Sequence, residues 1–218
     1  MLKCDYCGRE NPDDAIQCSG CANPLHDDPP VLKRTKAGFR LRAAARAIDT
    51  LFNFTLTWFI YMVIDGGFAV AAKAGWVSTD WQQRAHGYTL LIYVLGILAA
   101  VLYHTFCEGL HGATIGKLCC GLCVVREDRT PSNLSAAFIR SISFLLDSLF
   151  LGAVGYSAMR KSPLNQRFGD RWAKTAVLKI DELAPESRRS TGSLVLALGL
   201  GIGSIVVLVA VGWVQKLL

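Results

Sequence analysis

Four cysteines near the N-terminus have the spacing of a metal site. Cys4 and Cys7 form one C-x-x-C pair, Cys18 and Cys21 form a second, and ten residues separate the pairs. Each pair folds into a tight turn that points both sulfurs the same way, so two pairs supply four thiolate ligands for a tetrahedral zinc ion. Four thiolates leave no position open for water or substrate, so the zinc is predicted to be structural. Two disulfides are the alternative and would require an oxidising compartment.

A second group of polar residues follows one face of an apolar segment between Gly38 and Asp65. Its members recur at helical spacing: Arg42, Arg46, Asp49, Asn53 and Thr57. Polar groups on an otherwise apolar helix must face protein or a wet cavity, while the remaining surface faces lipid. Asp49 is then a candidate ligand for Na⁺ or a proton, and Arg46 would keep it ionised. Asp147 or Asp170 would serve as a second site.

The same charges have a structural interpretation. Arg42 at the cytosolic boundary would pair with Asp170 and clamp a later segment to the first helix. Asp49 would then be a buried partner that stays ionised. Ionisable groups inside a bilayer are costly and are normally kept for a reason, but charged pairs near the membrane surface commonly have only this structural role. The sequence leaves both interpretations open.

Composition identifies the class of protein. The 218 residues are 52% hydrophobic and 18% charged, with a mean hydropathy of +0.34, which fits several membrane segments joined by small polar parts. The net charge is +6, but the basic residues lie beside apolar segments, where anionic lipid head groups explain them better than nucleic acid does. The first thirty residues contain no apolar run, so no cleavable signal peptide is expected.

Three apolar stretches are predicted to span the membrane: 47–64, 88–107 and 193–214. The first is expected to end at Asp65-Gly66-Gly67, and Trp76 and Trp81 in the following connection suit the far lipid–water boundary. Six basic residues between Lys33 and Arg46 place the N-terminus in the cytoplasm. The sequence therefore predicts an inner (cytoplasmic) membrane protein whose zinc ribbon is cytosolic.

A fourth apolar segment, 134–158, is predicted to enter the membrane without crossing it. A full crossing would place the basic stretch after it outside, against the positive-inside rule. We therefore expect a re-entrant or broken helix, bent near Gly152 and Gly155, whose backbone is covered by protein or water.

The start of this segment matches an earlier stretch. RAAARAIDTLF (42–52) aligns with RSISFLLDSLF (140–150), which pairs Arg42 with Arg140 and Asp49 with Asp147. In transporters such repeats frame a central site. A chance match in an apolar background is the alternative.

The segment GATIGKLCCGLCVV (112–125) has the outline of a phosphate loop without its chemistry. Its glycines are one residue too close, and Leu118 stands where a Ser or Thr must hold Mg²⁺. We find no nucleophile paired with a base and no open metal site, so the chain is not expected to be an enzyme. Four further cysteines are interpreted as small buried hydrophobic residues, in preference to a second metal or redox cluster: Cys107, Cys119, Cys120 and Cys123.

Three separate motifs make residues 38–180 resemble the RDD family of integral membrane proteins, which is named for one arginine and two aspartates. They are Arg-x-x-Ala-x-x-x-Asp from Arg42, Gly-x-Thr-x-Gly-Lys from Gly112 with Gly-Leu-x-Val-Val after it, and Gly-Asp-x-x-Ala-x-Thr-x-Val from Gly169. The resemblance implies that Arg42, Asp49 and Asp170 are the naming residues. It also implies a proposed role in transport, including cation/proton exchange for some members.

The chain departs from the family pattern at two places. Cysteines stand at 119, 120 and 123, where aliphatic or basic residues are common, and Lys174 stands where a glycine is frequent. Residues 1–25 resemble the short zinc ribbons found at the N-termini of many prokaryotic membrane proteins.

The sequence thus predicts an all-α polytopic membrane protein with three spans, a re-entrant or short membrane-inserted segment and a small N-terminal Cys4 zinc ribbon. Its predicted parts are a ribbon (1–25), a linker (26–37), an RDD-like membrane domain (38–180), a second linker (181–192) and a C-terminal transmembrane helix (193–218).

Two functions fit the sequence. The first is a transport or permeation module for small cations or other small solutes, centred on Asp49. The alternative is a scaffold or regulator whose ribbon recruits a cytosolic protein to the lipid bilayer. Gly199 and Gly203 form a small-residue groove that predicts either a homo-oligomer or close packing against the second span.

Overall fold

The computed structural model describes residues 2–4, 7–13, 15, 18–21, 25, 37–76, 89–183 and 189–217. Helices dominate these residues, and each of the two sheets has only two strands. The predicted fold class is therefore confirmed. Trp81 and nearly all of the predicted linker 26–37 lie outside the described residues.

The first membrane helix, α2 (Phe39–Lys73), is longer than predicted. Its 35 residues extend about 52 Å at 1.5 Å per residue, well beyond the hydrocarbon core of a bilayer. The predicted end at Asp65-Gly66-Gly67 is wrong, because a glycine inside a helix costs only about 1 kcal/mol and helix-favouring alanines follow. The helix ends where Gly75 adopts a left-handed φ of 76° and the Trp76 N–H donates to the Ala71 carbonyl at 2.9 Å.

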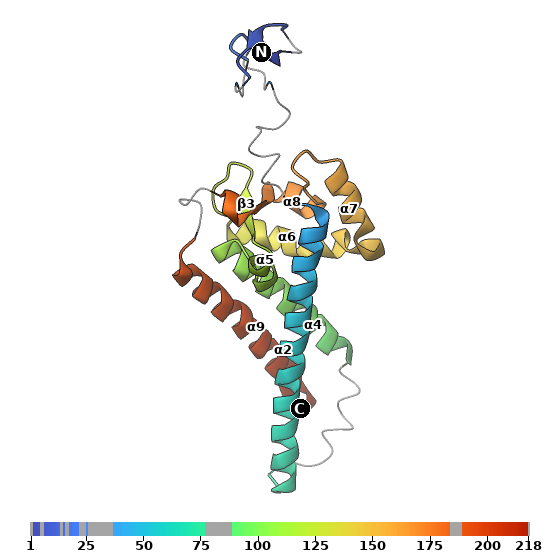
Figure 1. Ribbon diagram of the computed structural model, residues 1–218. Coiled ribbons are helices and arrows are strands. Elements are labelled where there is room, and N and C mark those ends of the chain that lie inside the picture. Colours follow the sequence, from blue (N-terminus) through green and yellow to red (C-terminus); the bar gives the residue numbers. More distant parts are fainter. Residues whose placement is uncertain are drawn as a thin grey trace.

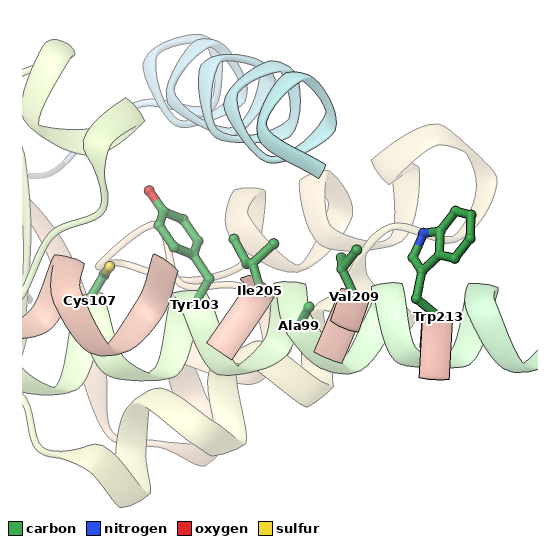
Figure 2. Close-up of a cluster of buried hydrophobic side chains, with 6 residues drawn as sticks. All are labelled: Ala99, Tyr103, Cys107, Ile205, Val209 and Trp213. Atoms are coloured by element: carbon green, nitrogen blue, oxygen red, sulfur yellow. The ribbon is translucent and has the colours of Figure 1, made fainter. Parts of the chain in front are cut away.

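Two further helices complete the candidate spans. They are α4 (Thr89–Phe106), which continues into the π-helical turn η2 (Cys107–His111), and α9 (Thr191–Leu217). With α2, they are long and apolar enough to cross a membrane, which confirms the predicted second and C-terminal spans. α4 and α9 pack side by side over a buried apolar cluster (Figure 2): Ala99, Tyr103, Cys107, Ile205, Val209 and Trp213.

Gly201 allows α9 to approach α4 closely. A Cβ atom at Gly201 would lie 3.1 Å from Tyr103 Cδ2 and 3.3 Å from Cys107 Sγ. A Cβ at Gly199 or Gly203 would meet no described atom within 4 Å. The packing of α9 against the second span therefore depends on Gly201, which lies between the two glycines of the predicted groove. A homo-oligomer through Gly199 and Gly203 stays a prediction.

The fourth apolar segment is broken, as predicted. It consists of α6 (Leu134–Asp147), the 3-10 turn η3 (Leu149–Gly152) and α7 (Ala153–Arg160), with a left-handed φ of 86° at Gly152. The 14 residues of α6 extend only about 21 Å, too little to cross the bilayer core. Figure 1 shows α6 beside the Phe39 end of α2 and running across it. One face of α6 is exposed and apolar, and the opposite face buries polar side chains.

A small antiparallel sheet lies at the same end of the molecule. Its strands are β3 (Leu122–Arg126) and β4 (Thr175–Lys179), paired so that Val124 lies opposite Val177. Each strand follows a short helix, α5 (Ile115–Cys119) or α8 (Phe168–Trp172). β3 was not predicted, because its cysteine- and glycine-rich surroundings carry no clear strand pattern.

The α4–α9 contact makes a prediction for stability. Gly201→Leu inserts a side chain where Tyr103 and Cys107 leave no room, so we expect it to lower the free energy of unfolding in detergent by about 1–3 kcal/mol. Gly199→Leu is the matched control, and it should leave stability unchanged or slightly raised because leucine favours helices. Thermal unfolding followed by circular dichroism measures both. Equal effects of the two substitutions would contradict this packing.

Candidate functional site

The four N-terminal cysteines come together as predicted. Their sulfur atoms all lie within 4.8 Å of one another, with Cys4 and Cys21 3.6 Å apart and Cys7 and Cys18 3.4 Å apart. Sulfurs bound to zinc at about 2.3 Å in a tetrahedron are separated by about 3.8 Å. The described cysteines are all free thiols, so the disulfide alternative is not what the structure forms. These four residues can hold a metal ion, and an all-thiolate set fits zinc.

Local hydrogen bonds shape the two turns that carry these cysteines. Strands β1 (Leu2–Lys3) and β2 (Glu10–Asn11) pair beside the first turn, where Gly8 has a left-handed φ of 74°. The buried Asn11 side chain accepts from the Ser19 N–H at 2.9 Å and so joins the second turn to the strands. The Gly20 N–H donates to the sulfur of Cys18 at 3.4 Å, which lowers the pKa of Cys18 to about 6 and favours the thiolate.

Asp170 is the centre of a buried charge cluster at the membrane domain's polar end. Its carboxylate is 1% exposed and binds Arg42 from α2 through one oxygen and Arg140 from α6 through the other. The Arg167 N–H also donates to it at 3.0 Å. Burial alone would raise the pKa of Asp170, but Arg140 and Arg42 hold it well below its usual value. The Arg42–Asp170 pair required by the structural interpretation is therefore present.

The cluster continues to two residues that the sequence analysis missed, Glu108 and Lys117. Arg140 Nε donates to Glu108 at 3.0 Å, and Lys117 donates to the other Glu108 oxygen. Burial would lower the pKa of Arg140, but Asp170 and Glu108 raise it. For Lys117, burial outweighs Glu108 and lowers the pKa to about 8. Glu108 and Lys117 could have been recognised from the sequence, since each is a lone charge beside an apolar stretch.

Asp49 lies apart from this cluster and is bound by the start of α5. Its carboxylate accepts hydrogen bonds from Thr114 Oγ1 at 2.6 Å, the Gly116 N–H at 2.8 Å and the Tyr103 hydroxyl at 3.3 Å, and Figure 2 shows that hydroxyl pointing toward α2. A Cβ at Gly116 would lie 2.0 Å from the Ala45 carbonyl oxygen. The Gly-x-Thr-x-Gly-Lys motif thus binds a carboxylate of its own chain.

Arg46, which is expected to keep Asp49 ionised, makes its direct contacts with other residues. It reaches His104 Nε2 on α4, and its guanidinium lies over the Phe144 ring of α6, 3.7 Å from the centroid. No ion pair between Arg46 and Asp49 is seen among the described residues.

Asp147 binds the start of α8 in the same way as Asp49 binds the start of α5. It accepts from the Phe168 N–H at 3.2 Å and the Gly169 N–H at 3.5 Å, and burial raises its pKa. A Cβ at Gly169 would lie 2.8 Å from Ser143 Cβ. Gly169 therefore permits α8 to approach α6 as Gly116 permits α5 to approach α2.

These parallels support the predicted internal repeat. Residues 114–126 align without a gap to 167–179, so that α5 matches α8 and β3 matches β4. Gly121 (φ 63°) then matches Lys174 (φ 50°), which explains why glycine suits position 174. Arg46 and Phe144 are equivalent and in contact, as are Val124 and Val177. The two halves are related by an approximate two-fold arrangement.

The sequence model of the RDD family matches residues 36–174, more than half of the chain. The chain belongs to the RDD family. The RDD match includes Arg42, Asp49 and Asp170 and ends immediately before β4. The cysteine ribbon and α9 lie outside it. No curated protein and no solved structure matches the chain.

The cysteine geometry predicts the metal content of the RDD protein. Full-length protein purified under reducing conditions should contain about one zinc ion per chain, and Cys18→Ser should lose most of it because three thiolates hold zinc more weakly than four. Cys119→Ser, an exposed cysteine outside the cluster, is the control and should keep the metal. Plasma mass spectrometry measures the content. Zinc retained by Cys18→Ser would contradict a four-cysteine site.

Proposed function

We propose that the membrane domain is a permeation module for small solutes, and that its route is a groove between α2 and α4. Two adjoining cavities support this proposal. One of about 290 Å³ is lined by polar residues of both helices, and one of about 380 Å³ continues it beyond Thr57. The polar lining of the first cavity consists of Arg46, Thr50, Asn53, Thr57 and His104.

These polar residues lie on candidate membrane spans. They belong to helices long and apolar enough to span the membrane, where polar side chains are kept against protein or water and away from lipid. The two cavities share Thr57, Gly96 and Ala100. A continuous, partly polar groove along α2 is a reasonable path for water and for solutes of similar size.

Charge indicates the class of solute. Among the described residues that line these two cavities, Arg46 carries the only full charge, and a positive lining favours neutral or anionic solutes over cations. Asp49 is 1% exposed and its carboxylate already accepts three hydrogen bonds. In this proposal Asp49 fixes α5 to α2, and a cation site centred on Asp49 stays a prediction for the same assay.

The proposed orientation places the N-terminus and the ribbon in the cytoplasm and the helices in the inner membrane. The basic residues before and within the first turns of α2 support it.

The alternative function is a scaffold that recruits a cytosolic protein through its ribbon. Two observations favour it. The ribbon can hold a metal ion with all four of its cysteines, and the charges around Asp170 are paired with one another. A scaffold needs no continuous groove and should pass no solute. A measurement of solute flux therefore distinguishes the two functions.

Flux in proteoliposomes tests permeation. We expect purified protein to pass Cl⁻ or small neutral solutes above empty liposomes, and Thr57→Leu to reduce the flux about tenfold by filling the groove. Thr55→Leu, on the exposed face of α2, is the matched control and should keep full flux. Asp49→Asn under Na⁺, K⁺ and pH gradients tests the cation site in the same vesicles.

Folded protein that shows no flux of any tested solute would contradict permeation and favour the scaffold. Equal flux from Thr57→Leu and Thr55→Leu would contradict the groove as the route.

A further inference from the structure

A separate cavity between α2, α6 and α7 gathers three arginines. It has a volume of about 310 Å³ and lies on the side of Arg46 and Phe144 that faces Asp147. Its main lining residues are Arg42, Arg46, Arg167, Asp147, Phe39 and Phe144. Arg46 also lines the proposed groove, but the two cavities lie on opposite sides of it. Ligand binding in this cavity can therefore be measured whether or not the groove conducts.

Two of the arginines that line this cavity have a buried nitrogen without a hydrogen-bond partner among the described residues. Arg42 is 8% exposed, yet its Nε has no hydrogen-bond partner among the described residues. Arg167 Nε is also without one, and the nearest carboxylate oxygen, on Asp170, is 4.0 Å away. Unpaired buried donors cost free energy, so the arginines around this cavity have fewer acceptors than they can use.

The charges of the cavity do not cancel. The guanidinium groups of Arg46 and Arg167 lie 3.7 Å and 5.7 Å from the centroid of the same ring, Phe144. Asp147 is the one carboxylate in the lining, and both its oxygens already bind backbone N–H groups of α8. Asp170 is shared between Arg42 and Arg140. A planar guanidinium with free donors is suited to phosphate.

The surroundings of the cavity indicate where that phosphate comes from. Arg42 and Arg46 lie within the first eight residues of α2, at one end of a candidate span. The neighbouring faces of α6 and η3 expose large apolar side chains, including Leu145 (54%), Leu149 (48%) and Phe150 (83%). An exposed apolar face beside a cationic pocket is typical of a helix lying in the membrane interface.

We propose that the cavity between α2, α6 and α7 binds the phosphate group of an anionic phospholipid, with Arg46 and Arg167 as its main ligands and the acyl chains along α6. Arg42 remains paired with Asp170 and adds to the positive charge of the cavity.

Lipid titration of the delipidated full-length protein tests this proposal. Native mass spectrometry in a neutral detergent should show phosphatidylglycerol binding about tenfold more tightly than phosphatidylcholine. Both lipids offer a phosphate, but the choline cation cancels its charge and is repelled by the arginines of the cavity. Arg46→Gln with Arg167→Gln should remove that preference. Arg171→Gln, an exposed arginine of α8 outside the lining, is the matched control and should keep it.

Two further measurements control for folding and distinguish a phospholipid from free phosphate. Arg46→Lys keeps the charge without the planar fork and should lose only part of the preference, which shows that a folded variant reports on the site. Inorganic phosphate should compete weakly with the lipid. Equal binding of the two lipids by the wild type, a preference kept by the double variant, or inorganic phosphate that binds while the lipid preference is absent would overturn the proposal.

Discussion

The carboxylate of Asp170 is the interaction on which the polar end of the membrane domain depends. It is almost fully buried and binds arginines from two different helices, while its own helix, α8, leads into the sheet. A buried charge is tolerated only when it is paired and hydrogen-bonded, so α2, α6 and α8 cannot separate without exposing an unpaired ion. Glu108 and Lys117 extend the same constraint to η2 and α5.

The three residues that the family resemblance singles out, Arg42, Asp49 and Asp170, have two different roles. Arg42 and Asp170 join elements through charge, whereas Asp49 binds the start of α5, as Asp147 binds the start of α8. The close glycines at 116 and 169 make both helix approaches feasible. The two-fold arrangement leaves Arg46 and Phe144 in contact between the halves, and the proposed groove and the proposed phosphate cavity lie on either side of them.

Much of the fold could be predicted from local patterns. Spans follow from apolar length, the ribbon from C-x-x-C spacing and the broken segment from charge placement and Gly152. The choice of partner for each charge could not be predicted, because a sequence does not state which of several carboxylates an arginine reaches. Arg46 contacts His104 and Phe144, although Asp49 is closer along the chain. The role of Gly116 could not be predicted either. This glycine permits α5 to approach α2, and the sequence does not show that α2 lies beside it.

The stability of Asp170→Asn tests the central claim most directly. With one substitution, Arg42 and Arg140 both lose a charged partner, so we predict a loss of about 3–5 kcal/mol in the free energy of unfolding in detergent. Asp181→Asn, at an exposed aspartate of the same chain, should change it by less than about 0.5 kcal/mol. If Asp170→Asn were as stable as Asp181→Asn, the buried carboxylate would not hold these helices together, and the account would be wrong.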